Sequence, residues 1–179
     1  MRITDIPVRV VRRLGELRRR GPRGIARACL TNYLIPSDFF PRDLIVPSLR
    51  AVGLEVAASC GLKGARIQTT QLSIGAGTWA NRGLYIEGDG PVSIGKGVLL
   101  GPEVLIVTST HERDDEQRVR PDATHRAVRI GNGCWIGARV VILPGVTIHD
   151  DVTVAAGAVV ASDVGPGGLY GGVPARKIR

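Results

Sequence analysis

Aliphatic residues recur every six positions from Ile74 to Val160, most of them followed by glycine or another small residue and then by two variable positions. The period shifts by two residues near Pro91, is suspended after Thr110, and resumes at Ile130. A six-residue period held over this length indicates a solenoid.

The repeat also predicts which side chains are buried. The fifth residue of one unit and the first residue of the next are two apart, so they share a face of an extended segment. These pairs are Val98 with Leu100, Val104 with Ile106, Val140 with Ile142, and Val146 with Ile148. Glycines at the second and fourth positions suit bends, where a positive φ or a missing Cβ relieves strain. Three short strands and three bends per coil make a triangular prism, so the predicted fold is an all-β solenoid, a parallel β-helix.

The sixth position of each unit points outward, and its occupants are more apolar than a solvated surface would be. If the six-residue period keeps its phase across the interruption, these outward residues form two stacks. One face carries Trp79, Leu99 and Trp135, and another carries Tyr85, Leu105, Val141 and Val159. The stacks indicate either an interface between copies of the chain or a surface covered by the chain's own N-terminal helices.

Residues 1–53 lack the repeat and are predicted to form a basic helical segment. Nine arginines against Asp5 and Glu16 give residues 1–27 a charge of +7, out of +8 for the chain. Apolar residues at helical spacing predict a first helix that ends at Gly21 and a second helix over 23–34. Their apolar sets are Ile6, Val10, Leu14 and Leu17, then Ile25, Cys29, Leu30, Tyr33 and Leu34.

The first helix has two interpretations. It would contact an anionic membrane surface weakly through residues 1–27, or it would pack on the prism with its arginines in solvent. No aromatic residues interleave with the arginines, which argues against nucleic acid as a partner.

A charged stretch at residues 111–126 is too polar to lie inside the prism and is predicted to project as a loop. A long loop leaving a regular solenoid is more often functional than decorative. His111 stands at an outward position where this loop departs. A neutral imidazole there can take a proton from a hydroxyl or an amine, which contributes about 10²–10⁴-fold in rate. His111 is therefore a candidate general base, and an ordinary surface histidine is the alternative.

Several motifs together show a resemblance to a known family. They are Asn81-Arg82-Gly83, Gly101-Pro102-Glu103-Val104, Thr108-Ser109-Thr110-His111, Gly131-Asn132-Gly133-Cys134-Trp135-Ile136-Gly137-Ala138, Pro144-Gly145-Val146-Thr147-Ile148 and Gly172-Val173-Pro174-Ala175-Arg176. Over roughly residues 54–179 the chain resembles the left-handed β-helix hexapeptide-repeat acyltransferases, in particular the sugar O-acetyltransferases of the maltose and galactoside type. Hexapeptides alone indicate only the fold, whereas the order of these motifs is more specific.

The resemblance implies a left-handed coil, a homotrimer with active sites between subunits, and direct transfer of an acetyl group from acetyl-CoA to a hydroxyl of a sugar or glycosylated acceptor. It implies that His111 is the base and that Asn81 holds the acceptor or orients the imidazole. The backbone N–H of Ala138 would stabilise the charge that develops on the thioester oxygen. The other implied positions are Trp135, Ala156, Ser162, Arg176 and Arg179 for the coenzyme, where guanidinium groups suit a diphosphate, and Tyr85 and Glu87, beside Asn81, for the acceptor. The implied chemistry requires no metal.

Other interpretations of these residues stay open. Asn81 also suits a turn cap, Trp135 suits interface packing, and Arg176 with Arg179 suits a solvated tail. Relatives commonly have Thr-Lys where this chain has Ala161-Ser162. One phosphate contact of the coenzyme would therefore be lost or would be made by Arg176 instead.

Three other functions are alternatives to O-acetyl transfer. One is an N-acetyltransferase acting on an amino or nucleotide sugar, and another is a non-catalytic solenoid scaffold. The third, a γ-type carbonic anhydrase, needs three metal-binding histidines. The spacing of His111, His125 and His149 does not resemble that family.

The sequence divides into a basic helical segment at 1–53, a β-helix at 54–164 with an excursion loop at 112–129, and a tail at 165–179. Prolines at 36, 41 and 47 mark a connecting segment before the first coil. The three cysteines form no CxxC pair, so neither a disulfide framework nor a zinc site is expected, and Cys134 takes an inward position. The lack of a long apolar run predicts a cytoplasmic protein.

Overall fold

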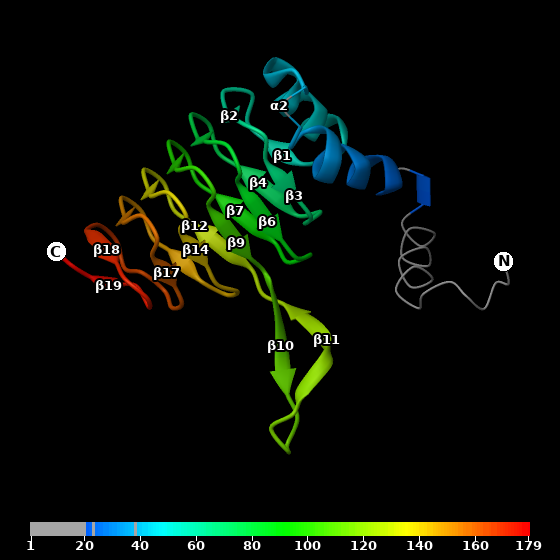
Figure 1. Cartoon of the computed structure of the whole chain (residues 1–179). Coiled ribbons are helices and arrows are strands. Elements are labelled where there is room, and N and C mark those ends of the chain that lie inside the picture. The colour runs from blue at the N-terminus through cyan, green and yellow to red at the C-terminus, as the bar shows by residue number, and fades with distance from the viewer. Residues whose placement is uncertain (1–20, 23, 38) are drawn as a thin grey trace, which may run out of the picture.

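A computed structural model of the chain describes residues 21, 22, 24–37 and 39–179. The first expected helix, at residues 6–17, lies outside the described residues. The described chain winds into a prism of stacked coils, with helices at its N-terminal end and a hairpin projecting from one edge (Figure 1).

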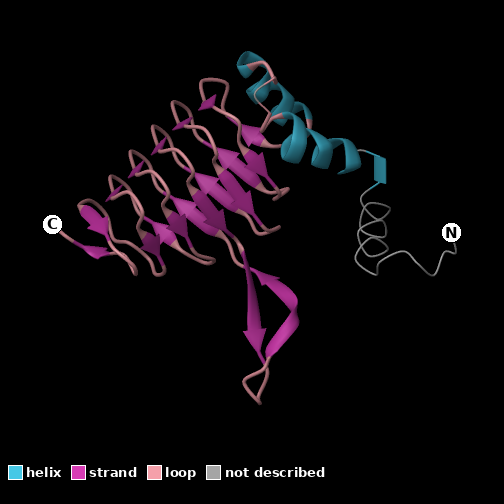
Figure 2. Ribbon diagram, in the orientation of Figure 1, coloured by secondary structure: helices cyan, strands magenta, loops and turns pink. Residues whose placement is uncertain are grey.

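Three parallel sheets form the sides of the prism (Figure 2). Sheet A contains β1 (Glu55–Val56), β4 (Leu72–Ile74), β7 (Val92–Ile94), β12 (Val128–Ile130) and β15 (Thr147–Ile148). Sheet B contains β2 (Gly61–Leu62), β5 (Trp79–Ala80), β8 (Leu99–Leu100), β13 (Trp135–Ile136), β16 (Thr153–Val154), β18 (Leu169–Gly171) and β19 (Arg176–Lys177), of which only β19 pairs antiparallel. Sheet C contains β3 (Arg66–Ile67), β6 (Tyr85–Glu87), β9 (Leu105–Val107), β14 (Val141–Ile142) and β17 (Val159–Val160). The chain visits the three sheets in turn, as a β-helix requires.

The prism is filled by the aliphatic positions of the repeat. Every side chain of the four predicted inward pairs is at most 2% exposed, so the predicted core is confirmed. Cys134 is also inward, at 1% exposure, and its thiol donates a hydrogen bond to the His149 carbonyl oxygen over 3.0 Å. Burial raises the pKa of the Cys134 thiol.

The two small positions of the repeat serve different needs at the bends. A Cβ on Gly137, at the second position, would lie 2.6 Å from the backbone nitrogen of Ala156, so the close approach of adjacent coils requires glycine. Gly97, at the fourth position, has a φ of +63°. Arg139 occupies the fourth position of another coil with a φ of 58°, so this position accepts a side chain even at positive φ.

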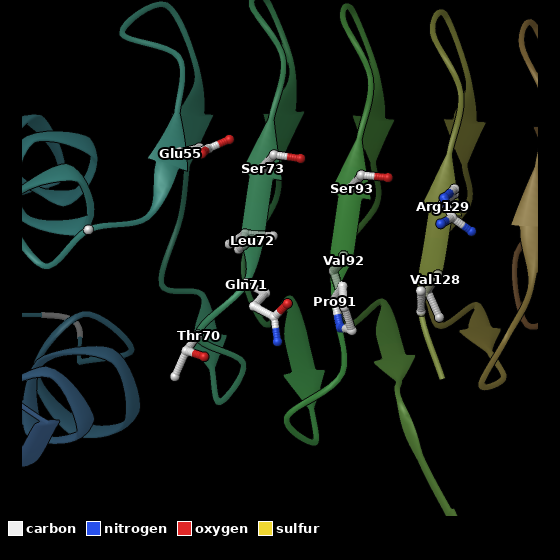
Figure 3. Close-up of a pocket in the computed structure, with 12 residues that line it drawn as sticks. Glu55, Thr70, Gln71, Leu72, Ser73, Pro91, Val92, Ser93, Val128 and Arg129 are labelled. Carbon is white, nitrogen blue, oxygen red and sulfur yellow. The ribbon is translucent and has the colours of Figure 1, made fainter. Parts of the chain in front are cut away.

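The outer faces of the sheets differ. Sheets B and C bear the predicted stacks, because Trp79, Leu99 and Trp135 are in register on sheet B, and Tyr85, Leu105, Val141 and Val159 are in register on sheet C. The outer row of sheet A is polar: Glu55, Ser73, Ser93 and Arg129 are in register (Figure 3). Thr147 follows Arg129 in the same row. The described helices contact β1, β2 and β3 at the end of the prism and leave Trp79 and Trp135 45% and 58% exposed.

The N-terminal helices only partly follow the sequence. Residues 24–29 are helical and continue into η2 (Leu30–Leu34), as expected for the second helix. Its expected apolar set does not form a buried face, since all but Leu30 are exposed.

The helix α2 (Arg42–Ala51) was not predicted, because Pro47 lies inside it. Buried Ile45, Val46 and Leu49 form its inner face, and this packing outweighs the proline penalty. No helix among the described residues has the length and apolar character needed to cross a bilayer.

The charged excursion projects from the prism as a β-hairpin of β10 (Ser109–Arg113) and β11 (Val119–His125), rather than as an irregular loop (Figure 1). At its tip the Asp114 carboxylate accepts hydrogen bonds from the backbone N–H groups of Glu116 and Arg118 at 3.0 and 2.9 Å, and an ion pair with the Arg118 side chain at 3.1 Å. The backbone hydrogen bond from Arg118 is the main cause of a lowered pKa of Asp114.

Candidate active site

His111 lies on β10, opposite Ala123, and shares a face of the hairpin with Ser109. Its Nδ1 lies 2.9 Å from the carbonyl oxygen of Arg120 across the hairpin. A carbonyl oxygen only accepts, so Nδ1 is assigned as the N–H of the neutral ring. The lone pair is then on Nε2, which is the tautomer that a general base needs.

Glu87 lies at the end of β6, where the chain leaves sheet C. The Oγ of Ser109 lies 2.8 and 2.6 Å from the two carboxylate oxygens of Glu87. This contact fixes the base of the hairpin two residues before His111. The imidazole itself is oriented by the Arg120 carbonyl oxygen.

Tyr85 and Glu87 are two residues apart on β6 and both face outward. The Tyr85 hydroxyl accepts a hydrogen bond from Nε2 of Gln68 over 2.7 Å, and the Arg66 guanidinium lies 5.4 Å from the Tyr85 ring centroid. The Oε1 of Gln68 also accepts from the Gly88 N–H at 3.0 Å. The Tyr85 hydroxyl, Gln68 and Glu87 therefore form a polar area on the outer surface of sheet C, and the stack becomes wholly apolar from Leu105 onward.

Asn81 lies at the bend between β5 and β6, and its Oδ1 accepts a hydrogen bond from the Arg82 N–H over 2.8 Å. Within one chain Asn81 therefore caps a turn, as one interpretation of the sequence expected. Asn81 precedes sheet C, whereas His111 follows it on the hairpin, so the width of sheet C lies between them. The chain does not bring these two residues together.

The positions implied for the coenzyme are also divided. Ala138 and Ala156 lie at the same edge as Asn81, after strands of sheet B, whereas Ser162 follows β17 and lies at the edge of His111. Arg176 lies on β19 and Arg179 follows it, both exposed. Asn81, Ala138 and Ala156 therefore lie at one edge of sheet C, and Glu87, His111 and Ser162 lie at the other.

The backbone at Ala138 suits the role of a hydrogen-bond donor. The Gly137 N–H donates to the Val154 carbonyl oxygen and the Ala138 carbonyl oxygen accepts from the Gly157 N–H, both at 2.8 Å. The Ala138 N–H donates to no other described residue. It is therefore able to donate to a bound molecule.

Neither a metal site nor a thiol nucleophile is indicated. No cluster of three or more histidine, cysteine or acidic side chains with metal-binding geometry occurs in the described part of the chain. Burial raises the pKa of the Cys60 thiol as well as that of Cys134.

A structure of the hexapeptide-repeat-containing acetyltransferase VCA0836 from Vibrio cholerae is 30% identical to this chain, covers 86% of it and 88% of its own length, and has a TM-score of 0.74. The chain belongs to the hexapeptide-repeat acyltransferase family. The predicted left-handed β-helix is therefore confirmed. The family described as "Bacterial transferase hexapeptide (six repeats)" matches residues 127–162.

The chain is also similar to a coenzyme-bound acetyltransferase structure and to galactoside acetyltransferases. VCA0836 has also been solved with acetyl coenzyme A, at 28% identity, 89% coverage of each chain and a TM-score of 0.74. A galactoside acetyltransferase in complex with coenzyme A is 28% identical, with 98% of this chain and 84% of that chain covered and a TM-score of 0.66. The galactoside O-acetyltransferase of Escherichia coli (strain K12) is 39% identical over 62% of this chain and 54% of its own length. The chain spans about half of the length of the curated relatives that it matches.

Two contacts at this family's candidate site were missed by the sequence. Arg120 contributes only its carbonyl oxygen, which every residue type has, so no motif could mark it. Ser109 stands in the motif that ends at His111, and its pairing with Glu87 depends on how the hairpin leaves the coil.

Proposed function

We propose that this chain is an acetyl-CoA-dependent O-acetyltransferase that acts on a hydroxyl of a sugar or glycosylated acceptor. The observation behind this proposal is the contact between Nδ1 of His111 and the Arg120 carbonyl oxygen, because in the neutral ring this contact places the proton on Nδ1 and the lone pair on Nε2. The names of the relatives supply the substrate class, and the exposed base supplies the chemistry.

The proposed reaction is a direct transfer. Nε2 of His111 takes the proton of the acceptor hydroxyl while the hydroxyl oxygen forms a bond to the thioester carbonyl carbon. The negative charge that develops on the carbonyl oxygen is stabilised by the Ala138 N–H. The C–S bond then breaks, the proton passes from His111 to the sulfur, and the products are an acetyl ester and free coenzyme A.

Acetyl-CoA fits the residues implied for it in part. Trp135 on β13 and Arg176 on β19 lie on the same sheet, three strand steps or about 14 Å apart, which suits a long ligand laid along sheet B. Ala156 lies one coil from Ala138 at the same edge, and the exposed Arg179 adds a second guanidinium for phosphate. Ser162 offers a hydroxyl where relatives have a lysine.

The complete site would form between copies in a homotrimer. Asn81 with Ala138 lies at one edge of sheet C, and His111 with Glu87 lies at the other. One copy would therefore supply the first pair to a site, and a neighbouring copy would supply the second pair. Tyr85 and Glu87 would contact the acceptor on the polar part of sheet C. The apolar stacks of sheets B and C support such an interface, and the polar face of sheet A would remain in solvent. The cytoplasmic location and the division into segments stay predictions.

The test begins with the donor. Acetyl-CoA at about 100 times its dissociation constant should stabilise the fold by about 2.7 kcal/mol and raise the melting temperature. Sugar and glycolipid acceptors, each with its amino counterpart, would then be screened for thiol release and for the acetylated product by mass spectrometry. Turnover with hydroxyl acceptors supports the proposal. Binding of acetyl-CoA with amine acceptors only would overturn the O-acetyl assignment, and no binding would overturn the donor.

A further inference from the structure

Several exposed large apolar side chains lie at the N-terminal end of the prism. Four of them fall within residues 33–44: Tyr33 at 60% exposure, Leu34 at 52%, Phe39 at 97% and Leu44 at 48%. We call these four residues the apolar patch. They are separate from the stacks of sheets B and C, because η2 and α2, which bear three of the four, make their main contacts with the first strand of each sheet.

The exposure of the patch is fixed by the local fold. The N–H and the hydroxyl of Ser37 both bond to the Leu34 carbonyl oxygen, at 3.0 and 2.6 Å, and the Phe40 N–H bonds to the Ser37 carbonyl oxygen at 3.3 Å. Ile35 is fully buried and Phe40 packs against the core. Because these two anchors point inward, their neighbours Leu34 and Phe39 are held outward.

Three basic side chains lie at the base of this turn. Arg42, Lys63 and Arg82 line a cleft at its base together with buried Ile35 and half-buried Phe40. Asp43 is the acidic residue in the first turn of α2. The sequence that precedes the patch adds the charge of +7 within residues 1–27. Exposed apolar residues beside basic residues match an anionic lipid bilayer best. Its acyl chains provide an apolar interior and its headgroups provide a negative surface.

We propose that the apolar patch inserts into the interface of an anionic membrane, with the basic N-terminal segment providing the electrostatic attraction. Nucleic acid would match the charge but not the exposed Phe39 and Leu34. This inference does not depend on acetyl transfer, and its test needs no turnover. A cyclic assembly would place every copy of the patch at the same end, which would multiply a weak contact.

The experiment is sedimentation of the full-length protein with vesicles of phosphatidylcholine alone or of equal parts phosphatidylcholine and phosphatidylglycerol. We expect binding to the anionic vesicles at ~0.1 M salt and its decline as screening increases. The double variant Leu34→Ser/Phe39→Ser should lower the partition coefficient by at least about tenfold, because apolar area no longer enters the bilayer. Val119→Ser is the matched control, since Val119 is 57% exposed on the hairpin and lies outside the patch.

Three outcomes would overturn the proposal. The first is that the protein does not sediment with anionic vesicles. The second is that the double variant binds them as tightly as the wild type. The third is that the double variant lowers the oligomeric mass in light scattering, which would mean that a second copy covers the patch. Equal binding to neutral vesicles would overturn the role of the basic segment, and Arg18→Gln/Arg19→Gln/Arg20→Gln would check it.

Discussion

The coils and the β10–β11 hairpin are built on different principles. In the coils every position has counterparts above and below, so that Ile106 pairs with both Ile86 and Ile142 in register. In the hairpin each contact occurs once, as with His111 and the Arg120 carbonyl oxygen. The difference indicates that stability resides in the repeated coils and that the proposed base chemistry resides in the exception to the repeat.

Removing the hairpin should separate the two regions most strongly. Ser109 and His125 are opposite partners, and the Arg126 N–H bonds to the Thr108 carbonyl oxygen at 2.8 Å, so an Asn-Gly turn can replace residues 110–124. We expect turnover to fall by about 10³-fold or more, because the base and its orienting carbonyl are lost together. Thermal unfolding should remain cooperative. A shortened protein that keeps its activity would contradict the assignment of chemistry to the hairpin.

A core substitution should have the opposite effect. Ile142 is fully buried, and Ile142→Ala should cost about 2–5 kcal/mol of unfolding free energy because it leaves a cavity in the ladder. Denaturant titration would measure the loss, and kcat of the folded fraction should stay within about twofold. Val141→Ala, on the outer face of the same strand, is the control and should cost the isolated chain less. A kcat that falls in step with stability would show that the coils and the chemistry are not separable.

The junction between the regions should show an intermediate effect. Ser109→Ala removes the hydroxyl that binds both oxygens of Glu87, and we expect the acceptor KM to rise by about three- to tenfold with little change in the acetyl-CoA KM. Ser109→Thr keeps the hydroxyl and should restore most of the affinity. Equal changes in both KM values would mean that the contact only stabilises the fold.

The smallest effect is expected at the hairpin tip. The pKa of Asp114 is lowered in the folded chain, so its contribution is present above the ordinary carboxyl pKa of about 4 and is lost as pH falls through the lower folded value. Hydrogen exchange of the Arg118 amide should therefore be slowed at neutral pH and lose protection in acid. Asp114→Asn should weaken this pH dependence while turnover is unchanged. A pH dependence retained in the variant would assign it to another group.

The extent to which the sequence predicts the structure differs between these regions for a physical reason. The core pairs such as Val140 with Ile142 and the outer stack of Trp79, Leu99 and Trp135 follow from a period that many residues repeat. The Arg120 carbonyl oxygen is independent of residue type, so the sequence could not indicate it. Helix α2 was missed because Pro47 opposes it locally and packing decides in its favour. The exposure of Phe39 depends on the inward packing of Ile35 and Phe40, which the sequence did not indicate.

The central claim is that His111 acts as a base without being needed for the fold. Measuring kcat and the unfolding free energy of His111→Ala on one preparation tests it most directly, with His149→Ala as the matched control. We predict that kcat falls by ~10²-fold or more while the unfolding free energy changes by less than about 0.5 kcal/mol. An unchanged kcat would contradict the account, because the acceptor proton would then have to leave by another group.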